Sequence, residues 1–191
     1  MKHSPFTALY DANVLYPAPL RDFLINLALT GIYRARWSAG IHDEWKRNLL
    51  LNRPDLTPEH VDRTSSLMDA AVPDALVTDY GSLVEGLDLP DEDDRHVLAA
   101  AIKCNASVIV TFNLKDFPKS VLGVFDIEPL HPDDFIADLW DLDKAAVLEA
   151  AQRQRISLKN PPHSVQQYLD RLLQQKLPET VKLLSGFKFL L

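Results

Sequence analysis

The sequence of 191 residues has a single cysteine, Cys104, so no disulfide can form within the chain. That scarcity suits a reducing compartment, and we expect a cytoplasmic protein. No second thiol accompanies Cys104, which excludes a metal site built on paired cysteines. We therefore predict that Cys104 is a buried helix residue.

Long apolar runs are also missing from the sequence. No stretch approaches the ~20 consecutive apolar residues that a membrane-spanning helix requires. The N-terminal segment has a weakly basic start, but Asp11 interrupts it where the apolar core of a signal peptide would lie. The sequence therefore predicts no membrane segment.

Positive charge is scarce over most of the chain, whose formal net charge is −7. Residues 1–150 carry 13 basic and 25 acidic side chains, whereas residues 151–191 carry 7 basic and 2 acidic ones. The acidic body argues against broad electrostatic adhesion to nucleic acid. The basic tail can still attract a polyanion if bound cations offset the acids, and a solvated helical face is the alternative explanation.

Short apolar segments alternate with amphipathic segments over the first two thirds of the chain. Strands are predicted at residues 6–10, 32–37, 75–78 and 107–111, with an edge strand at 124–130. Helices are predicted from Leu20 to Ala28, after Ser38 to about Leu51, at 58–71, and from Asp91 to about Lys103. This alternation indicates right-handed βαβ units, an α/β class and a mainly parallel sheet.

Strand signals disappear after about residue 130. Helices are predicted at 133–140, 142–155, 164–176 and 178–186. We therefore predict an α/β domain over residues 1–130 and a helical C-terminal extension over residues 131–191.

Acidic side chains stand where an open parallel sheet binds its ligands, beyond the carboxyl ends of the strands. Asp11 directly follows the first strand, and Asn113 and Asp116 follow the strand at 107–111. Asp94 stands at the start of the helix that feeds that strand. Glu44 lies about two turns into the helix after the second strand. We expect these four acids to converge at one edge of the sheet.

Such a gathering of acids requires a cation, because neighbouring like charges raise one another's pKa and oppose folding. Ligands that are all oxygen suit Mg²⁺ or Mn²⁺ rather than Zn²⁺. One or two such ions can lower the pKa of a bound water, orient it and stabilise charge on a phosphodiester. The pattern therefore predicts metal-assisted cleavage of a phosphodiester.

Each acid also has a purely structural explanation. Asp11 can be a turn residue at a strand end, and Glu44 an exposed helix acid. Asp91 is best explained as a helix cap, and Asp94 can be the acid of a capping box with it. Asp116 can merely cap the turn that follows the strand. No single acid is decisive, and the prediction depends on their joint pattern.

Four motifs resemble those of PIN-domain nucleases, the family that includes VapC-like toxins of bacterial toxin–antitoxin systems. In family order they are LYDANVLYP (9–17), SAGIHDEW (38–45), PDEDDRHVLAAAI (90–102) and VIVTFNLKDFP (108–118). The resemblance covers roughly residues 6–130. It implies a PIN-like α/β/α sandwich and an Mg²⁺ or Mn²⁺ site that cuts RNA.

The resemblance carries over to individual acids. Asp11, Glu44 and Asp94 stand at the first three acid positions of the family. Many members have an aspartate close after the threonine at the strand end, where this chain has Asn113 with Asp116 a turn later. We predict that Asp116 is the fourth acid and Asn113 its polar neighbour, and either could instead lie behind the ligands.

Two further polar residues belong to the predicted site. Asn13 and Thr111 are expected to orient substrate or ligands, although ordinary turn and strand roles explain them equally well. The chain beyond residue 130 departs from a minimal PIN domain, and no family residue carries over to it.

The predicted function is a metal-dependent endoribonuclease. The resemblance further implies the toxin of a toxin–antitoxin pair, with RNA as substrate, a cognate antitoxin as partner and a homodimer as assembly. The alternative is a catalytically degenerate PIN scaffold that binds RNA or a protein without cleavage. A haloacid-dehalogenase-like phosphatase is disfavoured, because its acid would stand where Asn13 lies, two residues after Asp11.

Overall fold

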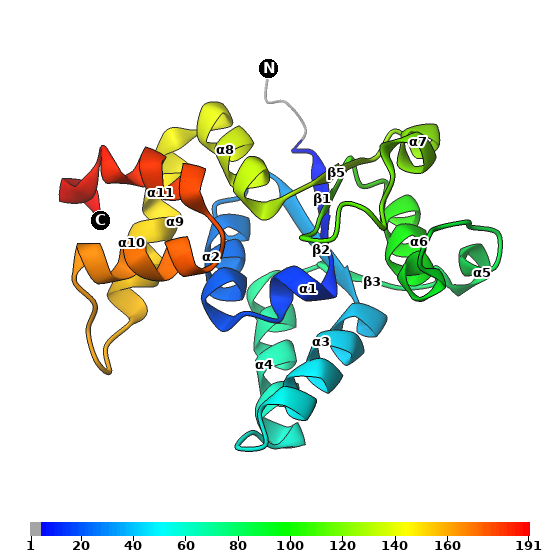
Figure 1. The fold of residues 1–191 in the computed structure, drawn as a ribbon, viewed down its shortest axis with the longest axis horizontal. Coiled ribbons are helices and arrows are strands. Elements are labelled where there is room, and N and C mark those ends of the chain that lie inside the picture. The colour runs from blue at the N-terminus through cyan, green and yellow to red at the C-terminus, as the bar shows by residue number, and fades with distance from the viewer. Residues whose placement is uncertain (1–4) are drawn as a thin grey trace. The chain divides into compact units, whose positions relative to one another are not determined.

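The computed structural model describes residues 5–191 and divides into two compact units. The first contains the chain up to Tyr16 together with Tyr33–His131, and the second contains Pro17–Ile32 and Pro132–Leu191 (Figure 1). By its contacts, the segment Pro17–Ile32 thus belongs with the C-terminal helices. The predicted domain boundary at residue 130 stays a prediction.

The first unit is built on a sheet of five parallel strands in the order β3-β2-β1-β4-β5. The strands are β1 (Thr7–Tyr10), β2 (Arg34–Ser38), β3 (Leu76–Val77), β4 (Val108–Val110) and β5 (Glu128–Leu130). β1 and β4 at the centre are buried throughout, as their apolar sequences predict for strands covered on both faces. The parallel sheet confirms the predicted α/β class.

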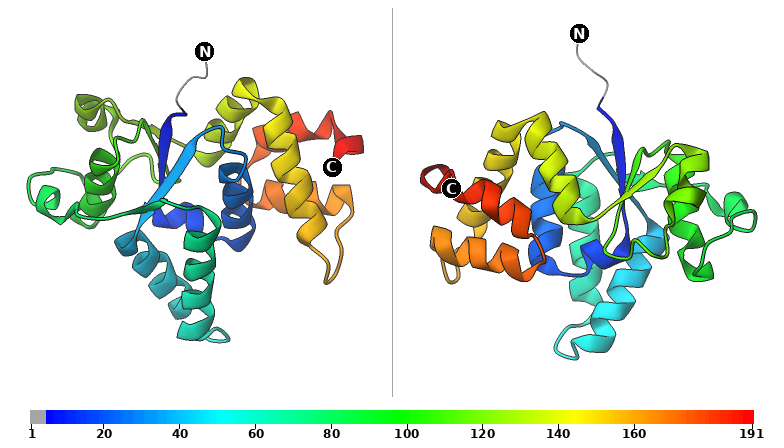
Figure 2. Two further views of the ribbon diagram at one scale, coloured as in Figure 1. Left: turned by 180° about the vertical axis from the view of Figure 1, so that it is seen from behind. Right: turned by 45° about the horizontal axis from the view of Figure 1, so that its top comes forward.

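Helices flank this sheet in a PIN-like α/β/α arrangement, as predicted (Figure 2). They are α1 (Ala12–Leu15), α3 (Ala39–Asn52), α4 (Pro58–Ala71), α5 (Gly81–Val84), α6 (Arg95–Lys103) and α7 (Lys119–Leu122), with 3-10 turns η1 (Glu92–Asp94) and η2 (Gly123–Phe125). α6 packs on β1, β2 and β4 through small and branched side chains that are fully buried, which allows a close approach to the sheet. α3 contacts β2, α1 and α4.

The second unit is entirely helical. It consists of α2 (Ala18–Ala28), α8 (Pro132–Leu142), α9 (Lys144–Ser157), α10 (Val165–Gln174), α11 (Pro178–Ser185) and the 3-10 turn η3 (Lys188–Leu190). Buried Gln154 on α9 joins its neighbours, since it donates to Pro19 O at 2.8 Å and accepts from Tyr168 Oη at 2.8 Å. These bonds satisfy polar groups that would otherwise be costly to bury.

Three local predictions need correction. The helix expected from Asp91 begins instead with the 3-10 turn η1, and α6 starts only at Arg95. The edge strand expected at 124–130 is confined to β5, because η2 occupies its first part and ends at Asp126 in a left-handed conformation (φ 56°). Cys104 is a half-buried residue that follows α6, since Asn105 takes φ 51° and stops the helix.

Within residues 5–191, every helix is too short or too polar to cross a bilayer.

Candidate functional site

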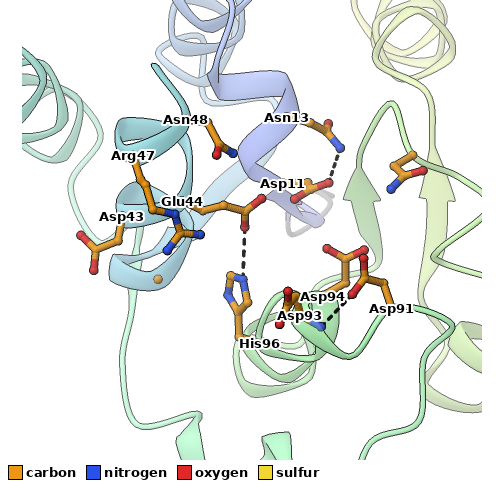
Figure 3. A pocket seen from close by; sticks show the side chains of 12 residues that line it. Asp11, Asn13, Asp43, Glu44, Arg47, Asn48, Asp91, Asp93, Asp94 and His96 are labelled. Carbon is orange, nitrogen blue, oxygen red and sulfur yellow. Dashed lines mark hydrogen bonds and ion pairs between the residues drawn. The ribbon is translucent and has the colours of Figure 1, made fainter. Parts of the chain in front are cut away.

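A cavity of about 680 Å³ lies in the first unit, at the carboxyl ends of β1, β2 and β4 (Figure 3). Polar and charged side chains make up almost all of its lining. They are Asp11, Asn13, Asp43, Glu44, Arg47, Asn48, Asp91, Asp93, Asp94, His96 and Asn113, with Gly40 beside them. Of the four acids that we expected to converge, Asp11, Glu44 and Asp94 line this cavity.

Asp11 is the N-cap of α1 and is almost completely buried, with 2% of its surface exposed. Its Oδ1 accepts from Ala12 N at 2.6 Å, and its Oδ2 accepts from Thr111 Oγ1 at 2.7 Å. The pKa of Asp11 is raised to about 6, chiefly by burial and also by the charge of Glu44, while the hydrogen bond from Thr111 acts to lower it. Asp11 is thus held rigidly in an environment that disfavours its charge.

Asn13 and Thr111 lock the ends of β1 and β4 together beside Asp11. Asn13 Nδ2 donates both to Asp11 Oδ2 at 2.5 Å and to Thr111 Oγ1 at 2.9 Å. Asn13 Oδ1 accepts from Phe112 N at 3.0 Å, and Thr111 Oγ1 also accepts from Asn113 N at 2.9 Å. Both residues therefore position the Asp11 carboxylate in this structure.

Asp91, Asp94 and Asp116 form a tight acidic group, of which Asp91 and Asp94 line the cavity. One carboxylate oxygen from each lies within 4.8 Å of the others, a spacing that suits a shared cation. Asn113 Nδ2 donates to Asp116 Oδ2. Burial, together with the charges of Asp11, Asp91, Glu44 and Asp116, raises the pKa of Asp94 to about 7. These carboxylates repel one another and would be stabilised by a positive ion.

Asp94 stands at the N-cap position of α6, but its side chain does not cap the helix. Its side chain makes no cap hydrogen bond to α6, and among the described residues its buried Oδ2 has no hydrogen-bond partner. The capping-box explanation of Asp94 therefore does not hold. A buried oxygen without a donor needs another partner, and a cation can supply it.

Asp91 is a member of the group that the sequence did not predict as a site residue. It caps η1 as expected, since its Oδ1 accepts from Asp93 N at 2.9 Å. The turn is 3-10 rather than α-helical, however, and residues three apart eclipse one another in a 3-10 helix. Asp91 therefore lies beside Asp94, which an α-helical expectation did not make evident.

Glu44 reaches the cavity from α3 and is paired with His96 of α6. His96 Nε2 and Glu44 Oε2 are 3.3 Å apart, and both side chains are partly exposed. Gly40 makes this approach possible, because a Cβ there would lie 3.2 Å from His96 Nδ1 and 3.0 Å from Tyr80 Oη. Sequence reasoning missed His96, since nothing in the sequence signals that it faces a helix 52 residues away.

The fold and these contacts agree with comparisons to known proteins. A family model described as PIN domain matches residues 7–115, which is more than half of the chain. The chain therefore belongs to the PIN-domain family, and the resemblance to it is confirmed. A second family model, described as the VapC50 C-terminal domain, matches residues 132–186, where no resemblance had been recognised from the sequence.

One relative comes from Mycobacterium tuberculosis and bears the name "Putative ribonuclease VapC50". It is 44% identical over 82 residues, which cover 43% of this chain and 48% of the relative. The aligned segment thus spans about half the length of that protein. No solved structure matches the chain.

Proposed function

We propose that this protein is a metal-dependent endoribonuclease that hydrolyses RNA phosphodiesters as the toxin of a toxin–antitoxin pair. One observation carries the proposal: carboxylates from distant parts of the sequence meet at one sheet edge, and among the described residues Asp94 Oδ2 has no hydrogen-bond donor. Asp11, Glu44 and Asp94 line the cavity, and Asp116 lies in the acidic group with Asp91 and Asp94. Membership of the PIN family and the ribonuclease name of the relative support this chemistry.

The site has the properties that a hard divalent cation requires. Its candidate ligands are carboxylate oxygens, which Mg²⁺ and Mn²⁺ prefer, and Asp94 Oδ2 lacks a hydrogen-bond partner in the described chain. When bound, the cation would lower the pKa of a water and stabilise negative charge on the phosphodiester. We propose Asp11, Glu44, Asp94 and Asp116 as the ligands, with Asp91 as an additional one.

The surrounding residues keep these carboxylates in place. Thr111 and Asn13 donate to Asp11, and Asn113 donates to Asp116. His96 holds Glu44 from α6. Such supporting bonds orient ligands and tune their basicity, so we assign these four residues positioning roles. Because the pKa values of Asp11 and Asp94 are raised, cation binding near neutral pH should also release protons.

A cleavage assay on a panel of defined RNAs tests the proposal. The protein should cut single-stranded RNA with Mg²⁺ or Mn²⁺ and should be inactive with EDTA. A protein that binds RNA but cuts none of the panel with either ion would instead be the degenerate scaffold. Turnover of a chromogenic phosphate monoester would favour the phosphatase alternative.

The toxin role, the antitoxin, the homodimer and the cytoplasmic location are proposals that follow from the family. Co-expression with the neighbouring open reading frame tests the antitoxin directly. We expect a stable complex and relief of growth inhibition. A chain that inhibits growth equally with and without that neighbour, and forms no complex with it, would contradict this assignment.

A further inference from the structure

We infer that Arg47, assisted by Asn48, binds a phosphate of the RNA strand adjacent to the phosphodiester that is cut. This inference rests on the proposed function, because it assigns a second contact to the same substrate. Neither residue belongs to the acidic set, and both line the cavity (Figure 3).

The position of Arg47 on α3 places it one turn beyond Glu44. Residues three and four apart share one face of an α-helix, so Glu44, Arg47 and Asn48 present their side chains to the same cavity. Three residues advance about 4.5 Å along the helix axis. An extended RNA strand whose scissile phosphate lies at the acids would therefore bring an adjacent phosphate to Arg47.

The charge of Arg47 has no partner among the described residues, although acids surround it. Its exposed guanidinium makes no ion pair in residues 5–191. Two other cations of this unit are paired: Lys46 contacts Asp43 and Asp62, and Arg95 contacts Glu92. Arg47 is therefore available to an anionic ligand in a cavity that is otherwise negative.

The chemistry of guanidinium selects the kind of ligand. Its planar fork of N–H donors matches the oxygens of a phosphate, and charge-assisted bonds of this type are strong. The Asn48 amide adds a neutral donor to the same ligand. An RNA backbone with successive phosphodiesters satisfies both regions at once, because a cation between the acids receives one phosphate and Arg47 the next. A lone monoester phosphate would satisfy only one of them.

Binding of a fluorescein-labelled single-stranded RNA in Mg²⁺, followed by anisotropy, tests this contact. The measurement uses Asp94→Asn protein as the parent, so that cleavage does not consume the probe. Adding Arg47→Ala should weaken binding about 10-fold, as expected for loss of a charged hydrogen bond. It should also reduce the slope of log affinity against log salt concentration by about 0.7, which corresponds to one phosphate of a single strand.

Arg63→Ala provides the matched control. Arg63 is an exposed arginine on α4 in the same unit, and it does not line the cavity. Its removal changes the net charge equally and should leave both affinity and salt slope unchanged. Arg47→Lys should restore most of the salt slope but only part of the affinity, since lysine lacks the forked geometry.

A chemically modified RNA identifies the phosphate. A single neutral methylphosphonate, moved one position at a time along the probe, should abolish the effect of Arg47→Ala at one position next to the cut site. In the active protein, Arg47→Ala should raise KM about 10-fold and change kcat little.

The outcomes separate this inference from the proposed function. Equal affinity and salt slope for the parent and the Arg47→Ala variant would overturn the Arg47 contact, even if the wild type cuts RNA. A wild type that cuts no RNA, while Arg47→Ala still weakens binding, would overturn the hydrolysis and keep the contact. Failure of both the wild type and the parent to bind any RNA would overturn both.

Discussion

Asp133 of the helical unit is buried and Asp94 of the sheet unit is half-buried, and the two carboxylates have opposite surroundings. Asp133 is 6% exposed and accepts from Glu179 N at 2.8 Å, Thr180 N at 2.8 Å and Thr180 Oγ1 at 2.7 Å. Its carboxylate thereby joins the start of α8 to the start of α11. Asp94 faces other carboxylates, and one of its oxygens has no partner in the described chain.

The contrast separates a structural acid from a candidate functional one. Donors at the N-terminus of α11 compensate the burial of Asp133, so that Asp133 stabilises the fold without a bound ligand. Among the described residues, Asp94 Oδ2 has no donor and its neighbours are carboxylates, so a proton or a bound cation would stabilise it. The neighbours distinguish the two residues, because hydrogen-bond donors surround Asp133 and carboxylates surround Asp94.

The largest expected effect is on activity, from Asp94→Asn. We expect RNA cleavage to fall by about 100-fold or more, the scale of losing one electrostatic stabiliser of a transition state. Single-turnover cleavage of the best RNA from the panel measures it. Asp88→Asn is the control, because Asp88 is exposed and does not line the cavity. Wild-type cleavage by a folded Asp94→Asn variant would refute the site.

The second prediction concerns stability and uses Asp133→Ala. Removing this acceptor leaves buried donors of α11 unsatisfied, which should destabilise the protein by about 2–4 kcal/mol. Urea unfolding measures the change. Asp134→Ala, on the exposed neighbour, should cost less than about 1 kcal/mol. Equal losses for both variants would show that the Asp133 bonds contribute nothing specific.

The third prediction tests how Glu44 is held. His96→Ala should raise the Mn²⁺ concentration for half-maximal cleavage about 10-fold, as loss of a bond to a ligand typically does. His60→Ala is the control, because His60 belongs to the N-terminal capping box of α4 in the same unit and does not line the cavity. A His96→Ala variant with unchanged Mn²⁺ dependence would leave Glu44 without a positioning partner of this kind.

The fourth and smallest effect is the pH dependence of stability without divalent cations. Asp11 and Asp94 have folded pKa values of about 6 and about 7, above the ordinary 3.8. Their stabilising contribution is therefore complete below about pH 4 and is lost as pH rises through 6 and 7. With solvent screening of half-exposed Asp94, we expect Asp94→Asn to gain on the order of 1–2 kcal/mol over the wild type between pH 4 and 8. Urea unfolding at several pH values measures this difference. A free-energy difference between the two proteins that stays constant from pH 4 to pH 8 would contradict the prediction.

Much of the fold could be predicted from the sequence, because the local patterns that mark strands and helix starts are strong. The β-branched run at 107–111 and the apolar run at 6–10 became the buried central strands β4 and β1. Ser38 and Thr57 marked helix starts correctly, since capping is a local property of the chain. The short helices α1, α5 and α7 were not predicted, because four residues carry too little periodicity.

The candidate site was only partly readable from the sequence. The placement of Asp11 and Asp94 followed from parallel-sheet topology, which sends strand ends and helix starts to one edge. The position of Asp91 beside Asp94 depends on a 3-10 turn, whereas the sequence predicted an α-helix there. The Glu44–His96 pair and the role of Gly40 depend on how α3 packs near α6, and single-sequence patterns do not encode such contacts.

Thermal unfolding of the wild type and of Asp94→Asn with and without Mn²⁺ at pH 7.5 tests most directly whether these acids form a cation site. At a concentration about 100-fold above Kd, a bound ion stabilises the folded protein by about 2.7 kcal/mol. For a chain of this size that raises the Tm by roughly 5–10 °C. We predict this rise for the wild type and a much smaller one for Asp94→Asn. An equal rise in both proteins, or none in the wild type, would contradict the account.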